Sequence, residues 1–185
     1  ELSPASVWRL FSGFHWAAYA PLTLASFSLE YALVGPAPWL YHATNLALHL
    51  AATALVLWWV LVLTGERGAA VATALLFGLH TLHVESVAWV AERRDVLYGL
   101  LFVASLVAYQ RYLGDRRWRL YAASLGLFLL SCLAKAVALT LAPVLLGVDL
   151  VAGRSLRDRR VLLEKAPFVA LALVAGVVVA LAPRS

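Results

Sequence analysis

Long apolar runs alternate with short polar segments along this chain, and their lengths predict helices that cross a membrane. A spanning helix needs about 20 apolar residues, or fewer where a polar cavity or a thin region shortens the crossing. The six runs that fit this rule are residues 39–63, 69–82, 96–112, 118–134, 136–151 and 166–182. A weaker run at 19–34 is interrupted by Pro21 and Glu30 and stopped by a Gly-Pro-Ala-Pro segment, so we expect a shallow or re-entrant helix there.

This pattern predicts an all-α protein, a polytopic transmembrane helical bundle of about six spans. We expect residues 1–38 to form a juxtamembrane or re-entrant segment on the outer face, and residues 39–185 to form one transmembrane helical domain, present in part. Composition agrees, because 63% of the residues are hydrophobic and 14% are charged, against about 45–50% and about 25% in ordinary soluble domains. Met is absent and the sequence opens on Glu1 without a signal-peptide pattern, so we expect part of a longer product.

The basic residues gather in three short segments that alternate with the apolar runs. Residues 64–68, 111–119 and 153–165 hold ten of the fifteen lysines and arginines. If the six spans alternate in direction, these segments share one face, which the positive-inside rule assigns to the cytoplasm. The net charge of +5 is therefore a topology signal, and we expect membrane lipid rather than nucleic acid as a partner. The other polar residues then lie on the opposite face, which is periplasmic or lumenal.

Residues 80–95, HTLHVESVAWVAERRD, hold the strongest concentration of ionisable groups, with two His, two Glu, two Arg and one Asp. Each charged side chain costs about 2.5–3.5 kcal/mol at the centre of a bilayer, so this cluster must lie at a membrane face or line a polar cavity. On a helix through 83–95, Glu85, Trp89 and Glu92 would share one face. The alternative is an interfacial helix end, in which Glu and Arg pair with each other and Trp89 belongs to the aromatic belt.

A polar stripe of His42, Asn45, His49 and Thr53 recurs at helical spacing along the first full span. His42 and Asn45 lie near the outer end of this span, level with the cluster, and are therefore site candidates. For His49 and Thr53 we expect interhelical hydrogen bonds, which are worth about 0.6 kcal/mol each. Lys135, at the turn between two spans, either snorkels to the interface or offers a cation to an anionic head group.

His80 and His83 are three residues apart, as metal ligands on a helix can be, and Glu85 could supply a third ligand. No cysteine accompanies them, and histidines at a loop end more often bond to backbone or to a carboxylate. We therefore expect no metal, with a divalent metal as the weaker alternative. Further along the chain, we expect Asp149 to pair with the basic segment that follows it.

Several motifs resemble those of a known family in both order and spacing. They are FGLHTLHVESVAWVAERRDVL at 77–97, YAPLT at 19–23, YHATNLALH at 41–49, LAKAVALTLAP at 133–143, LLGVD at 145–149 and EKAPF at 164–168. Along nearly its whole length the chain resembles a bacterial membrane-protein family with C-terminal tetratricopeptide repeats. That family is related to the eukaryotic transmembrane and tetratricopeptide-repeat O-mannosyltransferases, and it is usually written with Pro where Thr81 stands here.

The resemblance implies a glycosyltransferase of the C superfamily, an all-helical membrane fold that takes a sugar from a polyprenyl-phosphate carrier. It implies transfer to an acceptor hydroxyl, often of a protein Ser or Thr, as in O-mannosylation. It also implies a place in the bacterial inner membrane, with the active face in the periplasm. In that family a carboxylate of the first outer loop is the general base. We expect that loop before Glu1 and the tetratricopeptide repeats after Ser185.

Under this resemblance, the polar residues of the outer face become site hypotheses. We expect Arg93, Arg94 and Lys135 to face the donor phosphate, because a phosphate at the interface needs Arg or Lys. The predicted catalytic residues are Glu85, Glu92 and His83, and the other predicted substrate-binding residues are His80, His42, Asn45, Trp89 and Asp95. The expected donor is a polyprenyl-phosphate-linked sugar, the expected acceptor is a protein or another hydroxyl compound, and no further cofactor is implied.

Two other functions stay open. The chain can be a non-catalytic membrane module that binds a polyprenyl phosphate or assembles a complex. It can also be a transporter that uses buried His and carboxylate groups as a proton relay. A transporter should show charges at mid-span and inverted repeats, and the sequence shows neither, so we rank this function last.

Overall fold

The computed structural model describes residues 19–181, which are helical with short connections. The α-helices are α2 (Pro21–Val34), α3 (Pro38–Thr64), α4 (Arg67–Leu79), α5 (Leu82–Ala88), α6 (Arg93–Asp115), α7 (Trp118–Ala134), α8 (Leu141–Val151) and α9 (Arg159–Ala180). Two 3-10 segments, η1 (Val90–Glu92) and η2 (Ala136–Thr140), lead into α6 and α8. The all-α prediction is confirmed for these residues. Residues 1–18 of the predicted juxtamembrane segment, and residue 182 of the last predicted span, lie outside the described part.

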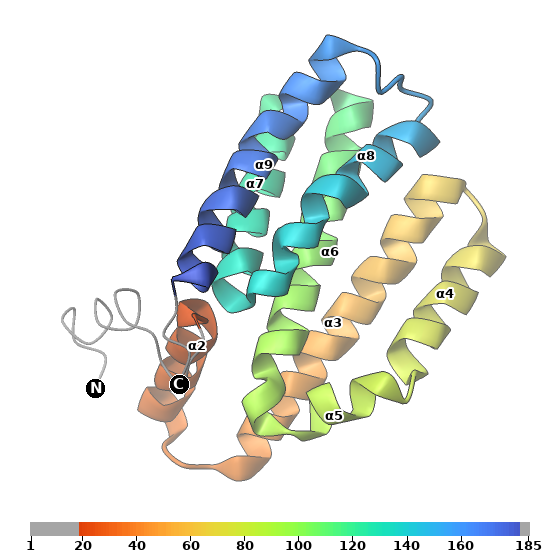
Figure 1. The fold of residues 1–185 in the computed structure, drawn as a ribbon. Helices are drawn as coiled ribbons and strands as arrows, with labels where there is room; N and C mark the ends of the chain where they lie inside the picture. The colour runs from red at the N-terminus through yellow and green to blue at the C-terminus, as the bar shows by residue number, and fades with distance from the viewer. Residues whose placement is uncertain (1–18, 182–185) are drawn as a thin grey trace.

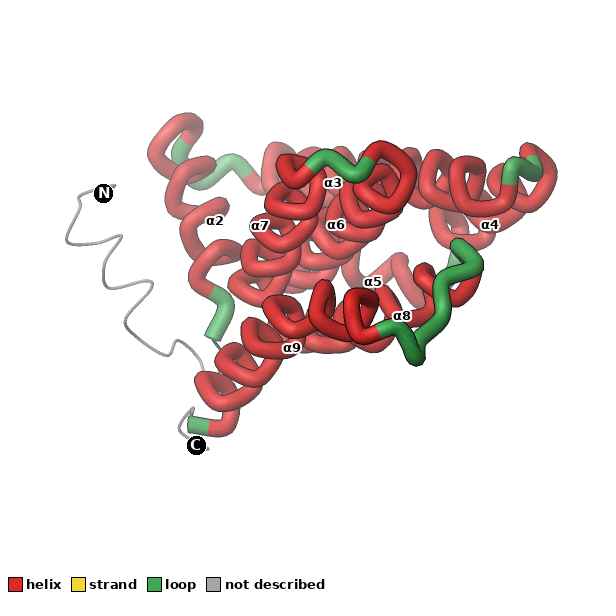
Figure 2. Tube along the Cα trace, turned by 90° about the horizontal axis from the view of Figure 1, so that it is seen from above, coloured by secondary structure: helices red, strands yellow, loops and turns green. Residues whose placement is uncertain are grey.

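The longer helices run lengthwise beside one another, and the short α5 crosses below them (Figure 1). Helix α6 is central, because it packs against α3 on one side and against α7 on the other. Helix α4 lies at the edge against α3, while α2 lies at the lower end beside α7. Seen from above, α4 stands apart from α7 and α9 (Figure 2).

The two ends of the bundle differ in chemistry. The α3–α4 turn, the α6–α7 turn and the α8–α9 loop all lie at the upper end in Figure 1, which we call the basic end (residues 64–68, 111–119 and 153–165). The α2–α3 connection, α5 with η1, and the α7–η2 turn lie at the opposite end, which we call the cluster end (residues 35–37, 80–92 and 135). The structure therefore places the three basic segments together, as the alternation of spans predicted.

Three helices are long and apolar enough to cross a membrane: Pro38–Thr64, Val90–Asp115 and Arg159–Val178. The pair Arg67–Leu79 and Leu82–Ala88, bent by 59°, adds a fourth if it counts as one broken span. These helices identify an integral membrane protein, but the prediction of six spans is wrong. Helix α7 has 17 residues, which is about 25 Å at 1.5 Å per residue, against a hydrocarbon core of about 30 Å. The apolar run at 136–151 is divided between η2 and an α8 of 11 residues.

Local chemistry explains where the long helices begin and end. Pro21 and Pro38 stand in the first turns of α2 and α3, where the missing N–H has no intrahelical acceptor to lose. Helix α3 ends at Gly65, which has a φ of 74° and donates its N–H to the Leu61 carbonyl at 2.9 Å. Arg116 ends α6 in the same left-handed region, with a φ of 54°.

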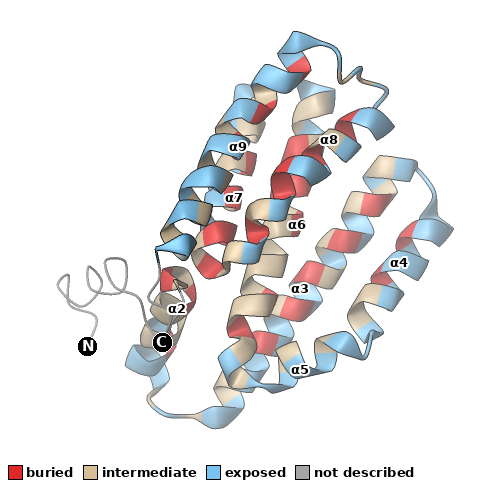
Figure 3. Ribbon diagram, viewed as in Figure 1, coloured by how far each residue is buried: buried red, intermediate tan, exposed pale blue. Residues whose placement is uncertain are grey.

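Two apolar clusters hold the bundle together. The larger cluster joins α6, α7, α8 and α9, and its buried members include Leu106, Tyr109, Phe128, Leu141, Leu145 and Phe168. The smaller cluster joins α3, α4 and α6, and it consists of Val56, Val60, Ala70, Val103 and Val107. Many apolar side chains on the outward faces of the helices stay exposed, as a lipid-facing surface requires (Figure 3).

Small residues let α4 approach α3 closely. Ala70 and Ala74 are the buried residues of α4, which packs chiefly against α3. A Cβ added at Gly78 would lie 3.0 Å from Cγ2 of Thr53, which is tighter than an ordinary contact. Thr53 donates to the His49 carbonyl within its own helix at 2.9 Å, so the interhelical hydrogen bond predicted for Thr53 is not made. His49 does bond across the two helices, because its Nε2 lies 3.1 Å from the Gly78 carbonyl oxygen.

Candidate functional site

The ionisable cluster lies on a broken helix. Helix α5 ends before Trp89, which has extended backbone angles, and α6 begins only after the turn of η1. The prediction of one continuous helix through 83–95 is therefore wrong. Glu85, Trp89 and Glu92 do not share a helix face, and the Trp89 side chain is 57% exposed. The sequence hides this break, because neither Gly nor Pro occurs between 80 and 95.

Arg93, the first residue of α6, is buried and fully engaged by protein groups. Only 1% of its surface is exposed. Its Nη1 forms an ion pair with Glu30 of α2, and its Nη2 donates to the Tyr41 carbonyl at 3.0 Å. The guanidinium also lies 4.4 Å from the ring centre of Phe27. A charge removed from solvent must be paired and hydrogen-bonded, and Arg93 satisfies both requirements with groups of α2 and α3.

Asn45 of α3 connects Arg93 to the helix break. Its Oδ1 accepts from Nε of Arg93 at 2.8 Å, while its Nδ2 donates to the Trp89 carbonyl at 3.3 Å. Thr44, the residue before it, donates to the Glu30 carboxylate at 2.6 Å. Two predicted substrate-binding residues, Arg93 and Asn45, thus meet in one buried network that holds α2, α3 and α6 together. Arg93 pairs with Glu30 rather than with Glu92 or another acid of its own segment.

A cavity of about 260 Å³ opens at the cluster end between α3, α4, α5 and α6. We call it the His83 pocket, and its lining residues are His49, Ala52, Phe77, Leu82, His83, Ser86, Asp95, Val96, Tyr98 and Gly99. The structure brings together two predicted site residues here, His83 and Asp95. Sequence reasoning did not place His49, Ser86 or Tyr98 in the site. Helical spacing would have pointed to Tyr98, because it follows Asp95 by three residues on α6.

The hydrogen bonds of His83 determine which ring nitrogen is free. Its Nδ1 lies 2.7 Å from the Phe77 carbonyl oxygen. A carbonyl can only accept, so Nδ1 carries the proton, and in the neutral ring Nε2 keeps its lone pair. Packing fixes the ring, because its centre lies 4.6 Å from that of Phe77 and 5.4 Å from that of His49. His83 therefore offers the pocket a positioned hydrogen-bond acceptor or proton acceptor.

Two ion pairs lie beside the pocket. Asp95 pairs with Lys135 from the α7–η2 turn, and Ser86 Oγ lies 3.5 Å from the second Asp95 oxygen. Glu92 accepts two hydrogen bonds from Arg94, at 3.1 and 2.7 Å. The Arg94 side chain is 40% exposed and that of Lys135 is 27% exposed. Both cations retain N–H groups that these contacts do not use, so both can contact an anionic ligand.

Four of the other predicted residues do not line the His83 pocket. His42, His80, Glu85 and Trp89 are all exposed. His80 has a local role, because its Nδ1 accepts the N–H of Leu82 at 3.2 Å and so supports the start of α5. Among residues 19–181, no three His, Cys, Asp or Glu side chains are grouped so as to hold a metal ion.

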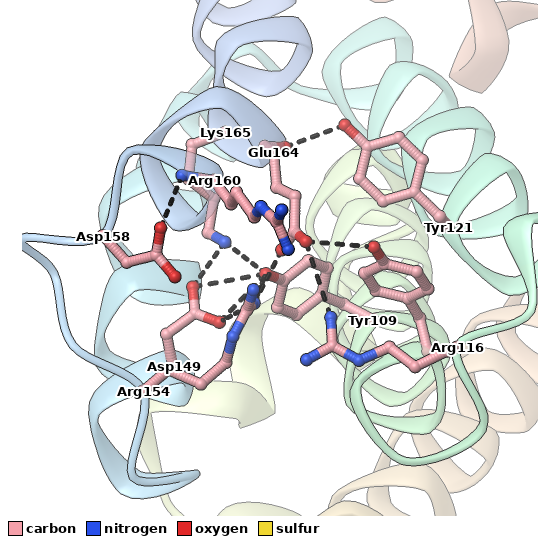
Figure 4. Close-up of polar contacts among 10 residues, drawn as sticks. Tyr109, Arg116, Tyr121, Asp149, Arg154, Asp158, Arg160, Glu164 and Lys165 are labelled. Carbon is pink, nitrogen blue, oxygen red and sulfur yellow. Dashed lines mark hydrogen bonds and ion pairs between the residues drawn. The ribbon is translucent and has the colours of Figure 1, made fainter.

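A second polar cluster joins α6, α8 and α9 at the basic end (Figure 4), and we call it the Asp149 network. Asp149 is 0% exposed, and it pairs with both Arg154, at 2.7 Å, and Lys165. Tyr109 donates to the same carboxylate at 3.1 Å. Arg154 also donates to Glu164 at 2.6 Å, and this bond, together with that to Asp149, raises the pKa of Arg154 above its usual value.

The prediction that Asp149 pairs with the following basic segment is confirmed. Sequence reasoning included Lys165 in that basic segment but did not connect Tyr109 or Glu164 to this network. A signal was present, because the motifs LLGVD at 145–149 and EKAPF at 164–168 meet through the ion pair of Asp149 and Lys165. The groups of this network satisfy one another, which is typical of a structural ionic cluster.

Part of the chain is distantly homologous to protein O-mannosyl-transferases. The mouse protein O-mannosyl-transferase TMTC1 is 39% identical over 118 residues, which is 57% of this chain and 12% of that protein. The human protein O-mannosyl-transferase TMTC2 is 37% identical over 105 residues, which is 57% of this chain and 12% of that protein. The Drosophila melanogaster protein O-mannosyl-transferase Tmtc2 is 34% identical over 151 residues, which is 78% of this chain and 16% of that protein.

The matched stretch is thus a small part of these relatives, between 12% and 16% of their length. No protein-family model matches the chain, and no solved structure matches it. The predicted relation to O-mannosyltransferases is confirmed as distant homology, while the bacterial repeat family stays a prediction.

Proposed function

We propose that this chain is part of a membrane glycosyltransferase that takes a sugar from a polyprenyl-phosphate donor and transfers it to an acceptor hydroxyl, as in protein O-mannosylation. Homology to the membrane regions of protein O-mannosyl-transferases supports this reaction class. The observation that carries the proposal is the His83 pocket, where His83, Ser86 and Asp95 converge beside two partly exposed cations.

The pocket has the size and chemistry for one sugar ring. Its volume of about 260 Å³ lies just below the range of about 300–1,000 Å³ for sites that enclose drug-sized ligands. Ser86, Asp95 and Tyr98 supply hydroxyl and carboxylate groups that pair with sugar hydroxyls, while Phe77 supplies an aromatic wall. Its mixture of a few polar groups with apolar walls is typical of small-molecule sites.

His83 is the residue that we assign to proton transfer or to orientation of a reacting hydroxyl. Its Nδ1 proton is held by the Phe77 carbonyl, so its Nε2 lone pair is available to a ligand. Glu92 is less available, because both of its oxygens accept from Arg94. Glu85 and His42 are exposed outside the pocket, so we assign neither of them to the sugar ring.

The donor phosphate is assigned to Arg94 and Lys135. Both lie at the cluster end, both are partly exposed, and both retain free N–H donors. Arg93 was predicted to share this role, but its guanidinium donors already bond to Asn45, Glu30 and Tyr41. We therefore propose that Arg93 positions the start of α6, and with it the next two residues, Arg94 and Asp95.

The proposed location is the bacterial inner membrane, with the cluster end facing the periplasm. The basic end holds ten of the fifteen lysines and arginines, which favours the cytoplasm for that end. The His83 pocket then faces the periplasm, on the side where the motif resemblance implies that the donor is used.

A second function is favoured by the ion pairs of the pocket. Glu92 and Asp95 both have cationic partners, so neither is a free carboxylate base in this structure. This arrangement suits a non-catalytic module that binds a polyprenyl phosphate, and whose chemistry, if any, is supplied by other residues.

The proposal is tested by the affinity of the purified chain in detergent for a short-chain polyprenyl-phosphate mannose. His83→Asn places an amide near the Nδ1 position, so it keeps the bond to Phe77 and removes the free Nε2. We expect about tenfold weaker binding, because one lost hydrogen bond to a ligand costs about 1–1.5 kcal/mol. The matched control is His42→Asn, which changes an exposed histidine at the same end.

The expected result is weaker binding in His83→Asn, with an unchanged melting temperature and with full binding in His42→Asn. If the parent does not bind, or if both variants bind as the parent does, the pocket is not the donor site. Mannose transfer to a Ser/Thr peptide, measured on the longer protein that also contains the expected first outer loop, separates the two functions, because an enzyme transfers the sugar and a binding module retains the donor unchanged.

A further inference from the structure

The arginines of the basic end fall into two groups. Arg116 and Arg154 pair with Glu164, while Arg111 stacks over the ring of Trp58 at 5.6 Å. Six others are exposed, and none of them forms an ion pair within the described chain. One is Arg67 at the start of α4, and the remaining five are Arg117, Arg119, Arg157, Arg159 and Arg160. These five residues, which we call the arginine patch, therefore present unpaired positive charge.

Two separate segments supply the arginine patch, and contacts between α7 and α9 bring these segments to the same side of the bundle. Helices α7 and α9 both begin at the basic end, and they are held together there. The Tyr121 hydroxyl of α7 donates to the Glu164 carbonyl of α9 at 2.8 Å (Figure 4). Arg116, one residue before Arg117, lies 3.5 Å from the carboxylate of the same Glu164. The first turn of α7 therefore lies beside the second turn of α9, one turn from Arg159 and Arg160.

Few acids offset this charge. The exposed carboxylates next to the patch are Asp115 and Asp158, so five arginines face two acids, with a net charge of +3. Trp118 lies between two of the arginines in sequence, and its side chain is 72% exposed. An exposed Trp beside arginines at the end of a membrane helix is typical of the head-group layer.

Apolar surface continues directly from the arginine patch toward the middle of the bundle. Leu162 and Leu163 follow Arg160 on the first turn of α9, and they are 49% and 58% exposed. A ligand that bears both an anionic group and hydrocarbon chains can contact the two kinds of surface at once. A soluble polyanion would contact only the charged one.

We propose that the arginine patch binds the head groups of anionic phospholipids in the leaflet that the basic end faces. The guanidinium fork pairs well with phosphate oxygens, and each basic residue near an anionic bilayer contributes about 1 kcal/mol of attraction. An excess of basic residues on the cytoplasmic face is enough to orient the protein in the membrane, and it does not require the arginines to gather on one side of the bundle. In this chain they gather on the α7 and α9 side, whereas the α4 side of the basic end holds Arg67 alone. The inference does not depend on the proposed transferase function.

The test uses the whole chain in a neutral detergent, titrated with phosphatidylglycerol or with phosphatidylcholine, and follows the thermal unfolding midpoint. A ligand that binds only the folded state raises that midpoint, and the rise grows with the logarithm of the ligand concentration divided by its Kd. Two patch variants, Arg157→Gln/Arg160→Gln and Arg117→Gln/Arg119→Gln, remove two charges each. The matched control, Arg67→Gln/Arg111→Gln, removes two charges from the same end but outside the patch.

We expect phosphatidylglycerol to raise the midpoint of the parent and phosphatidylcholine to leave it unchanged. Each patch variant should bind phosphatidylglycerol about tenfold to thirtyfold more weakly, while the control variant binds within about twofold of the parent. Equal losses in the patch and control variants would show a general effect of net charge and overturn the proposal. So would equal stabilisation by the two lipids, or full competition by inorganic phosphate alone. In lipid-free detergent, every variant must have the same thermal unfolding midpoint as the parent. A double variant that does not is replaced by its two single substitutions.

Discussion

The Arg93 guanidinium and the Glu30 carboxylate form a buried ion pair, although 63 residues separate them along the chain. This pair joins the peripheral helix α2 to the first residue of α6. Asn45 extends the connection to the helix break at Trp89. The start of α6, which carries Arg94 and Asp95, is therefore positioned by residues of two other helices.

The first prediction concerns this ion pair. Arg93→Met removes the cation and leaves the Glu30 carboxylate buried without its partner. We expect the free energy of unfolding to fall by about 3–5 kcal/mol, because an uncompensated buried charge is costly. Reversible unfolding of the detergent-solubilised chain would measure it. The control, Arg94→Met, breaks a partly exposed pair and should cost about 0–1 kcal/mol. Equal stability of the two variants would show that the Arg93–Glu30 ion pair does not stabilise the fold.

The second prediction concerns the Asp149 network. Asp149→Asn leaves Lys165 and Arg154 without the carboxylate that they share, in a site with almost no exposure. We expect a loss of about 3–5 kcal/mol in unfolding free energy. Asp158→Asn is the matched control, because Asp158 is an exposed carboxylate of the same loop and Asn keeps the side-chain oxygen that accepts the Arg160 N–H at 2.9 Å. Stability should change by less than about 0.5 kcal/mol. A stable Asp149→Asn variant would mean that the network does not hold α8 to α9.

The third prediction concerns the close contact between α3 and α4. Gly78→Ala adds a Cβ 3.0 Å from Cγ2 of Thr53, so the two helices must separate slightly. We expect a loss of about 1–3 kcal/mol, as for overpacked cores. Gly68→Ala in the same helix is the control, since nothing lies within 4 Å of its added Cβ. It should be neutral or stabilise by up to about 1 kcal/mol, because Ala favours a helix over Gly. The opposite ranking of the two variants would contradict the contact.

The fourth prediction concerns orientation. In a Cys132→Ser background, cysteines replacing Gly114 and Ser155 at the basic end should resist an impermeant thiol reagent added outside intact cells. A cysteine replacing the exposed Glu85 at the cluster end should react. Ser155 is chosen instead of Gly153, because Gly153 has a φ of 72° that a cysteine would strain. External labelling at Gly114 and Ser155, with protection at Glu85, would reverse the proposed topology.

The sequence alone predicted the helices well and their interruptions poorly. Apolar periodicity located every long helix, because burial in lipid needs an unbroken apolar run. It did not show that the run at 136–151 changes from 3-10 to α geometry at Leu141, because the residues on both sides of this change are apolar. The sequence also did not indicate the break at Trp89. It is held by Asn45, a partner 44 residues away, rather than by a local Gly or Pro.

The candidate site shows the same limit. His83 and Asp95 were predicted from the density of ionisable groups, and both line the pocket. The burial of Arg93 could not be predicted, because Glu30 is distant in sequence and was noted only as an interruption of an apolar run. The pairing of Asp149 with the basic segment that follows it was predicted correctly, because its partner Arg154 lies only five residues further along the chain.

The walls of the His83 pocket come from two parts of the fold, one at the centre of the bundle and one at its edge. Asp95 and Tyr98 stand on the central helix α6, whereas Phe77 and His83 stand on the arm formed by α4 and α5, which packs mainly against α3 at the edge of the bundle. Movement of that arm alone changes the width of the pocket without disturbing the α6–α9 core. The width of the pocket therefore depends on how closely α4 packs against α3, and the absence of a side chain at Gly78 allows the close approach to Thr53.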